Sequence, residues 1–322
     1  MQDSSSLLVR MTSVLDYSEA SKHNFCARNF SFKANEAQNN LRLFKLFGIT
    51  MKNSALPIFL SISILLLVPS ESYSTGKNTR TLSHYSRYLQ KDQKMNVYVP
   101  ESTGRHSVLY LLHGATGDYT NWLDRTDLKN IADKYNLIIV MPDGGTFSWY
   151  SDSQLIPESQ YESYVVKELI PFIDSSFATY AEKNGRGVCG LSMGGFGAIK
   201  FGLKYPQLFS SASSLSGVLV VMRHPDKWSM VKVFGTLSDN ASNWKREDLI
   251  EMAQSSKDTT VALKFDTGVD DVTLEDNRLF LSILQKLRRT FEYGEFPGGH
   301  TWRYWGSHIE EHLQFHSRHL LH

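Results

Sequence analysis

Residues 190–194 read Gly-Leu-Ser-Met-Gly, and this Gly-x-Ser-x-Gly pattern constrains the fold more than any other stretch of the chain. An apolar run ends just before it and a helix-like segment follows, which predicts a sharp turn between a buried strand and a helix. Side chains at Gly190 or Gly194 would collide with the strand or the helix on either side. The turn exposes the Ser192 hydroxyl and aims the Met193 amide at the point where negative charge forms during attack.

Residues suited to activate this serine follow downstream, in the order acid and then histidine. A serine hydroxyl is almost wholly protonated at neutral pH, so Ser192 needs a base, which we assign to His300 after two glycines. An acid must then hold the imidazole in one tautomer. Asp270 and Asp271 both follow a strand-like run, in the loop where catalytic groups of parallel sheets collect, and we prefer Asp271.

Upstream, residues 110–115 form an apolar run that ends in His-Gly-Ala. We expect the Ala115 amide to join the Met193 amide in an oxyanion hole, and we expect His113 to shape the loop rather than act as a base. Trp149 and Tyr150 follow another strand and so reach the same edge of the sheet. Their aromatic rings fit either an acyl or aryl pocket or the core, and the sequence leaves this choice open.

Strand and helix signals alternate beyond residue 86, which predicts a central, mostly parallel sheet covered by helices on both faces. A hairpin is expected first, with strands at 86–89 and 95–99 across a turn at Lys91 and Asp92. Strands are expected at 107–112, 137–142, 212–216, 261–266 and 291–296, helices at 128–134, 161–177 with a kink at Pro171, 275–289 and 304–321, and an irregular insertion at 218–246.

The N-terminal part differs in character. Residues 1–50 are mixed and polar, and we expect no packed structure there, or an extension ahead of the true start of translation at Met51. An apolar stretch of about 14 residues at 55–68 follows a basic start and precedes small residues, which suits a signal peptide at 51–74 better than a membrane span. The sequence therefore predicts an exported, secreted or periplasmic protein, with an uncleaved membrane anchor as the alternative.

The amino-acid composition gives no reason to expect nucleic acid or a metal cluster as a partner. A hydrophobic content of 41% allows a sizeable core, and a net charge of +1 without a basic run gives no reason to expect nucleic acid. The two cysteines, Cys26 and Cys189, are too few for a disulfide framework or a zinc cluster, and Cys189 is expected to be buried and inert. No metal and no cofactor are predicted. The C-terminal histidines are expected to be solvated; they are His308, His312, His316, His319 and His322.

Taken together, these motifs resemble the esterase family of α/β hydrolases that includes tributyrin esterase, esterase D (S-formylglutathione hydrolase) and feruloyl or acetylxylan esterase modules. The resemblance spans about residues 86–318 and rests on the segments at 111–114, 148–150, 190–195, 214–217, 268–271 and 299–305. It implies an α/β-hydrolase domain over residues 77–322. It also implies a cofactor-free serine carboxylesterase with Asp271 as the catalytic acid, because the family's acid ends a Gly-x-x-Asp pattern.

The expected activity is hydrolysis of short-chain acyl or hydroxycinnamoyl esters, as small molecules or attached to polysaccharides. An acyltransferase with the same triad, an S-formylglutathione hydrolase-like thioesterase and a non-enzymatic binding module are the alternatives. The natural ester and the oligomeric state are not predicted from the sequence, because the pocket depends on how the insertion at 218–246 folds.

Overall fold

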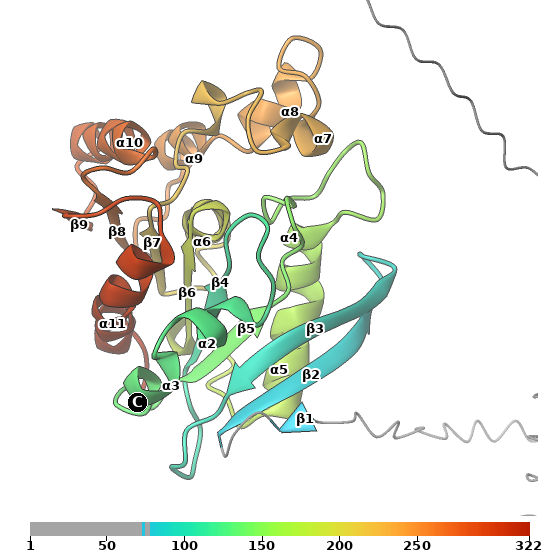
Figure 1. Cartoon of the computed structure of the whole chain (residues 1–322), viewed down its shortest axis with the longest axis vertical. Helices are drawn as coiled ribbons and strands as arrows, with labels where there is room; N and C mark the ends of the chain where they lie inside the picture. Colours follow the sequence, from blue (N-terminus) through green and yellow to red (C-terminus); the bar gives the residue numbers. More distant parts are fainter. Residues whose placement is uncertain (1–72, 75–77) are drawn as a thin grey trace, which may run out of the picture. The chain divides into compact units, whose positions relative to one another are not determined.

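The computed structural model describes residues 73–74 and 78–322, and a nine-stranded sheet lies at the centre of this part of the chain (Figure 1). Six neighbouring strands are parallel, and three further strands form an antiparallel edge. The predicted α/β-hydrolase fold class is confirmed. In order across the sheet the strands are β1 (Tyr73–Ser74), β2 (Thr79–Ser86), β3 (Lys91–Tyr98), β5 (Ile138–Pro142), β4 (Val108–Leu112), β6 (Arg186–Leu191), β7 (Ser211–Leu215), β8 (Ala262–Gly268) and β9 (Glu292–Phe296).

Each face of the sheet has its own hydrophobic core. Along β4, Val108, Tyr110 and Leu112 belong to one core, whereas Leu109 and Leu111 belong to the other. Side chains alternate along a strand, so a strand buried on both faces reads as an unbroken apolar run. The first face is covered by α4 (Tyr161–Tyr164), α5 (Ile170–Ser176), α6 (Met193–Lys204), α9 (Leu249–Ser255) and α10 (Leu274–Lys286), and the second by α2 (Asn121–Arg125), α3 (Leu128–Ala132) and α11 (Trp302–His319).

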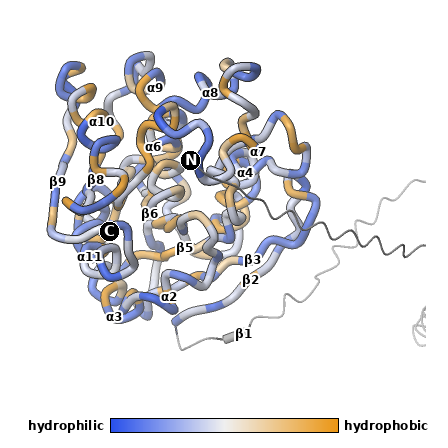
Figure 2. The backbone as a smooth tube through the Cα atoms, turned by 45° about the horizontal axis from the view of Figure 1, so that its top comes forward, coloured by the Kyte–Doolittle hydropathy of each residue, from blue (hydrophilic) through white to orange (hydrophobic). Residues whose placement is uncertain are grey.

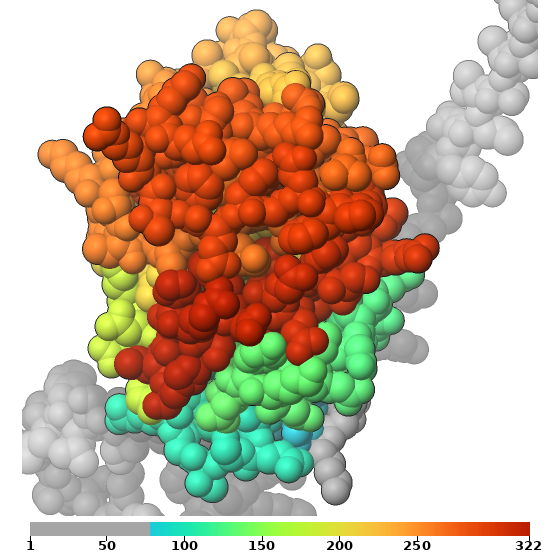
Figure 3. All heavy atoms as spheres, turned by 90° about the vertical axis from the view of Figure 1, so that its left-hand side faces the viewer, coloured from blue at the N-terminus to red at the C-terminus, as the bar shows by residue number. Residues whose placement is uncertain are grey.

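The two hydrophobic cores can be followed in the arrangement of the chain. Hydrophobic residues gather along α6 and the inner strands, whereas the outer turns are hydrophilic (Figure 2). In the space-filling view the C-terminal helix α11, in dark red, lies against the green segment that contains α2 and α3 (Figure 3). The end of the chain therefore closes one face of the sheet against a segment almost 200 residues earlier.

The hairpin predicted at the sheet edge is present, but its turn does not lie at Lys91 and Asp92. Residues 87–90 form the turn, with Gln90 at φ 53°, whereas Lys91 and Asp92 already belong to β3. The prediction of a strand at 86–89 is therefore wrong. The alternation of polar and apolar residues over 86–89 falls mostly within this turn and does not mark a strand.

The helical segment predicted at 161–177 is interrupted just before Pro171. The helix α4 passes into a π-helix at Val165–Leu169 and then into α5. Pro171 has no N–H to bond the carbonyl four residues earlier, so the helical hydrogen-bond pattern changes at this position.

The insertion expected to be irregular contains three short helical segments separated by turns. It contains a 3₁₀ turn at Val221–Arg223, α7 (Met230–Phe234) and α8 (Ala241–Arg246), and α9 follows it without having been predicted. The fully buried ring of Trp244 packs edge-on against Phe234 and its indole donates to the Gly235 carbonyl at 2.9 Å. One aromatic residue therefore holds these short helices together.

The prediction that the C-terminal histidines are solvated is wrong for two of them. His312 and His316 are fully buried under the sheet. His312 Nε2 lies 2.5 Å from an Asp266 carboxylate oxygen, and His316 bonds the hydroxyls of Ser211 and Ser213 at 2.7 Å each. Their spacing of four residues places both on the face of α11 that meets polar side chains of β7 and β8.

Most of the N-terminal predictions, over residues 1–50 and 51–74, lie outside the described residues. The exception is the pair Tyr73–Ser74, which forms β1 and pairs with β2. Within the described part of the chain, no helix is both long and apolar enough to cross a membrane.

Candidate active site

Ser192 lies at the turn between β6 and α6, as the Gly-x-Ser-x-Gly pattern predicts. Its backbone has φ 53° and ψ −117°, a strained conformation that is rare for residues other than glycine. A Cβ atom added at Gly190 would lie 2.3 Å from the Gly194 carbonyl oxygen, and one at Gly194 would lie 2.5 Å from the His113 carbonyl oxygen. Only glycine fits at these two positions, so the sequence forces the turn that presents the Ser192 hydroxyl.

Three residues far apart in the sequence meet at this turn. His300 Nε2 lies 2.8 Å from Ser192 Oγ, and His300 Nδ1 lies 2.9 and 3.1 Å from the two carboxylate oxygens of Asp271. Each residue follows a different parallel strand, β6, β8 or β9, and the carboxyl ends of parallel strands share one edge of the sheet. Gly298, at φ 133°, lets the loop after β9 reach back over the serine.

Asp271, rather than Asp270, contacts the imidazole. Thr273 donates two hydrogen bonds of 2.8 Å to Asp271 Oδ1, one from its backbone N–H and one from its hydroxyl. Burial alone would raise the pKa of Asp271, but the hydrogen bonds and the charge of His300 outweigh it and hold that pKa below its usual range. The carboxyl is therefore an anion at neutral pH, suited to accept a hydrogen bond from the His300 Nδ1–H.

The loop at 113–115 lies directly against the serine turn. A Cβ added to Gly114 would lie 2.5 Å from Leu191 Cδ1 and 3.3 Å from Ser192 Cβ, so the loop approaches as closely as glycine permits. Ala115 lines the pocket in front of Ser192. Met193 begins α6, where backbone N–H groups have no partner within the helix. Both amides thus belong to segments that border Ser192.

His113 holds this loop in shape, as expected. Its Nε2 accepts a hydrogen bond of 2.7 Å from the Gly144 N–H, and its Nδ1 lies 2.7 Å from the Gly114 carbonyl oxygen. Burial lowers the pKa of His113. The ring is therefore neutral, with its proton on Nδ1, and both nitrogens are engaged by the backbone.

A pocket of about 500 Å³ opens over Ser192 and His300, between two aromatic walls. On one wall the Trp149 indole donates to the Trp228 carbonyl at 3.2 Å, and their rings lie 6.4 Å apart. On the other wall the Trp302 and Trp305 rings lie 5.3 Å apart. Trp305 also packs edge-on against the His300 ring at 5.0 Å, which helps to orient the imidazole.

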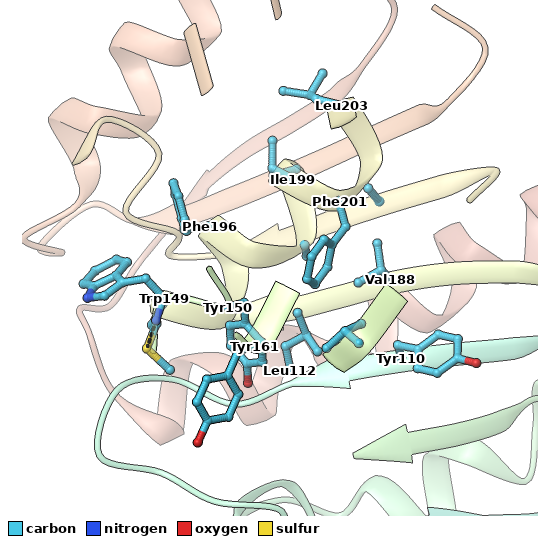
Figure 4. Packing of buried hydrophobic residues seen from close by; sticks show 14 of the residues in the cluster. Tyr110, Leu112, Trp149, Tyr150, Tyr161, Val188, Phe196, Ile199, Phe201 and Leu203 are labelled. Carbon is cyan, nitrogen blue, oxygen red and sulfur yellow. Dashed lines mark hydrogen bonds between the residues drawn. The ribbon is translucent and has the colours of Figure 1, made fainter. Parts of the chain in front are cut away.

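The structure separates Trp149 from Tyr150. Trp149 lines the pocket, and its backbone N–H contacts Met193 Sδ at 3.3 Å (Figure 4). Tyr150 is fully buried and donates from its hydroxyl to the His113 carbonyl at 3.1 Å. The buried Lys200 ammonium holds the Tyr150 carbonyl at 2.8 Å. Tyr150 is thus a core residue that supports the loop. Trp149 is also almost fully buried, with 1% of its surface exposed, and it belongs to the same core while bordering the pocket.

Several pocket residues were not predicted as such from the sequence. Trp228 lies in the insertion, Arg125 ends the short helix α2, and Phe147 and Trp305 carry no motif that distinguishes pocket from core. Cys189 is buried on β6, and burial raises the pKa of its thiol to about 12, which makes it unreactive. Within residues 78–322, no group of three or more histidine, cysteine or acidic side chains is arranged to hold a metal ion.

The parallel sheet, the strained serine turn and the contact of Ser192 with His300 and Asp271 define the class of α/β hydrolases. The family model described as "Putative esterase" matches residues 86–316, and the chain belongs to this family. An esterase of Mycobacterium tuberculosis is 31% identical over 239 residues, covering 65% of this chain and 52% of that protein. The chain thus spans about half the length of these first relatives.

An acetyl esterase of Caldicellulosiruptor saccharolyticus is 27% identical over 260 residues, which cover 74% of this chain and 97% of that protein. Among solved structures, an S-formylglutathione hydrolase from Agrobacterium tumefaciens superposes with a TM-score of 0.70 and 22% identity, covering 78% of this chain and 98% of the other. At this identity the structural similarity establishes the fold alone.

Proposed function

We propose that this chain hydrolyses carboxylic esters through an acyl-enzyme formed on Ser192. The observation that carries the proposal is the continuous hydrogen-bonded contact from the Ser192 hydroxyl through His300 to Asp271 at the edge of an open pocket. Membership of the esterase family and the similarity to an acetyl esterase support it.

The geometry supports a two-step mechanism. Ser192 Oγ attacks the ester carbonyl while His300 Nε2 takes the hydroxyl proton, and Asp271 stabilises the imidazolium that results. The backbone N–H groups of Ala115 and Met193 would stabilise the oxyanion of the tetrahedral intermediate. His300 then returns the proton to the leaving alcohol, which departs and leaves the acyl group on Ser192. Water, activated by His300 in the same way, releases the acid and restores the serine.

The pocket favours short acyl or hydroxycinnamoyl esters, including those attached to polysaccharides. Its volume of about 500 Å³ is at the lower end of small-molecule sites, which excludes long acyl chains from full burial. The half-buried Trp228, which packs beside the almost fully buried Trp149, offers an aromatic surface that suits an aromatic acyl group in offset or edge-on contact.

A substrate panel tests the proposal. Purified protein is expected to hydrolyse p-nitrophenyl acetate and p-nitrophenyl butyrate, and methyl ferulate if the aromatic wall receives the acyl group. Ser192→Ala should abolish turnover, whereas Ser175→Ala, a matched change at an exposed serine on α5, should leave it intact. Absence of turnover on every ester, or turnover that survives Ser192→Ala, would contradict the mechanism.

We further propose that the protein is exported by the segment at 51–74, with a catalytic domain from about residue 77. The support is the apolar stretch at 55–68 with its basic start. N-terminal sequencing of protein recovered outside the cytoplasm tests this. A first residue near 74–77 agrees with cleavage, and an intact N-terminus at Met51 would instead indicate a membrane anchor.

A further inference from the structure

Only one of the two pocket walls carries a full positive charge. The wall formed by the end of α2 and the start of α11 contains Arg125, whereas the Trp149 wall contains no ionisable side chain among the residues that line the pocket. The lining also contains no aspartate or glutamate. The Asp271 side chain, the nearest carboxylate to the chemistry, is fully buried behind His300. The field inside the pocket is therefore positive on one side.

Two hydrogen-bond donors on this wall lack an acceptor. The exposed side chain of Arg125 forms no ion pair or hydrogen bond with any described residue, and the indole Nε1 of Trp305 is buried with no hydrogen-bond partner. Trp305 is only 6% exposed. A buried donor without an acceptor is uncommon in native proteins, so the Trp305 indole calls for an explanation, whereas water solvates the exposed Arg125 guanidinium. An acceptor supplied by the substrate would be such an explanation.

The two donors belong to neighbouring segments. A Cβ added to Gly306, the residue after Trp305, would lie 3.9 Å from the Arg125 carbonyl oxygen and 3.5 Å from Thr126 Cγ2. The other amide donor nearby is already engaged, because Asn121 Nδ2 donates to Asp118 at 3.2 Å. Among the side chains of this wall, only Arg125 adds a full positive charge to its donor groups.

We propose that this wall binds an anionic group of the ester substrate, a carboxylate in the simplest case, and that Arg125 is the residue that selects for it. The proposal rests on the proposed esterase activity and adds the substrate's charge to it. A guanidinium matches a carboxylate through two parallel hydrogen bonds, and Arg125 is the only lysine or arginine in the pocket lining. Because Ser192 lies between the two walls, the anion would flank the scissile bond and could belong to the acyl part or to the alcohol part.

Matched ester pairs distinguish these two sources. For the acyl side, 4-nitrophenyl hydrogen succinate is compared with its neutral methyl ester, both followed by nitrophenolate release. For the alcohol side, 4-acetoxybenzoate is compared with methyl 4-acetoxybenzoate. The quantity measured is the ratio of kcat/KM for the anionic and neutral members of each pair, at low and at high ionic strength.

We expect the wild-type protein to prefer the anionic member of one pair, with a preference that weakens in high salt. Arg125→Gln should lower that ratio about fivefold to tenfold while kcat/KM for the neutral ester changes less than about twofold. Arg125→Lys should retain part of the preference, and Arg125→Glu should reverse it. Arg303→Gln removes an equal charge from an exposed position on α11 outside the pocket lining, and it should leave both ratios unchanged.

Equal ratios in wild type and Arg125→Gln for both pairs, in a protein that hydrolyses the neutral esters, would overturn the assignment of Arg125 and leave the proposed function intact. A fall in the ratio equal to that of Arg303→Gln would also overturn it, because it would reflect net charge only. Absence of hydrolysis of the neutral esters by the wild type would remove the proposed function and this inference together.

Discussion

Replacing Asp271 by asparagine changes one atom of the site and tests how the base is held. Asp271 Oδ1 already accepts two hydrogen bonds of 2.8 Å from Thr273, so the asparagine oxygen would stay at that position. The amide nitrogen would then occupy the Oδ2 position, 3.1 Å from His300 Nδ1. Two N–H donors would face each other, and the imidazole would move its proton to Nε2.

With its proton on Nε2, His300 donates to the Ser192 hydroxyl at 2.8 Å and can no longer accept its proton. We therefore expect kcat to fall roughly 1,000- to 10,000-fold, or about 4 to 5.5 kcal/mol of transition-state stabilisation, as for a catalytic histidine held in the wrong tautomer. KM for a small ester should change little, because the pocket walls are unaffected.

The assay is the steady-state hydrolysis of p-nitrophenyl acetate, accompanied by a thermal melt of each variant. Asp270→Asn is the matched control, because Asp270 is exposed and does not contact His300. We expect it to retain activity within about twofold. If Asp271→Asn keeps more than a tenth of the wild-type kcat while folded, or if Asp270→Asn loses as much, the assignment of the acid is wrong.

Three further changes test the structure around the site. Glu162→Gln should lower the free energy of unfolding at pH 7 by about 2 kcal/mol, because Glu162 pairs with the fully buried Lys200 at 3.1 Å. Burial raises the pKa of Glu162, but Lys200 and a second lysine outweigh it and hold that pKa at about 2. The stabilisation is therefore present above about pH 4.5 and lost as the pH falls towards 2, so urea unfolding curves of variant and wild type should converge there; a constant difference would contradict this. Gly114→Ala should reduce kcat on p-nitrophenyl acetate about tenfold to hundredfold, because the new methyl group would meet the serine turn, and unchanged kcat would show that the loop can yield. Tyr304→Phe should cost about 1 to 2 kcal/mol in a thermal or urea melt, since the hydroxyl bonds the buried Asp266 at 2.9 Å; an unaltered melting curve would mean that the bond contributes nothing.

The serine turn could be predicted from the sequence because its backbone geometry admits few residues. At Gly190 and Gly194 even one methyl group would overlap backbone atoms of a neighbouring segment. The turn therefore requires glycine at both positions, and these two glycines can be recognised in the sequence. The order of acid and histidine after it, and the strands that carry them, follow from the alternation of apolar runs. The serine turn, the order of the acid and the histidine, and the strands before them could therefore be predicted from local sequence patterns.

The buried histidines and several pocket residues could not be predicted, because their positions depend on contacts between segments that are distant in the sequence. His312 and His316 carry the same helical spacing that a solvated face would show, and only the polar side chains of β7 and β8 beneath them explain their burial. Trp228 lines the pocket because α7 and its preceding turn fold back towards the loop at 144–150, a path without a local signature. Arg125 carries no motif in the sequence, and it remains exposed in the structure; only the fold shows that it lines the same pocket as Trp305.

The choice between Trp149 and Tyr150 illustrates the same limit. Both are aromatic neighbours after one strand, and both have positive φ angles, of 55° and 47°. A turn of this kind sends adjacent side chains in different directions: both are buried, but only Trp149 reaches the pocket lining. Side-chain type alone carries no information about which residue takes which direction.

The measurement that tests the central claim most directly is the site of covalent capture by an aryl phosphonate ester, a reagent that resembles the tetrahedral intermediate and releases a phenol on reaction with an activated serine. Mass spectrometry of the digested protein should find one adduct, on the peptide that contains Ser192, and His300→Ala should slow its formation at least about a hundredfold. An adduct on another residue, or equal labelling of the folded His300→Ala variant, would contradict the account.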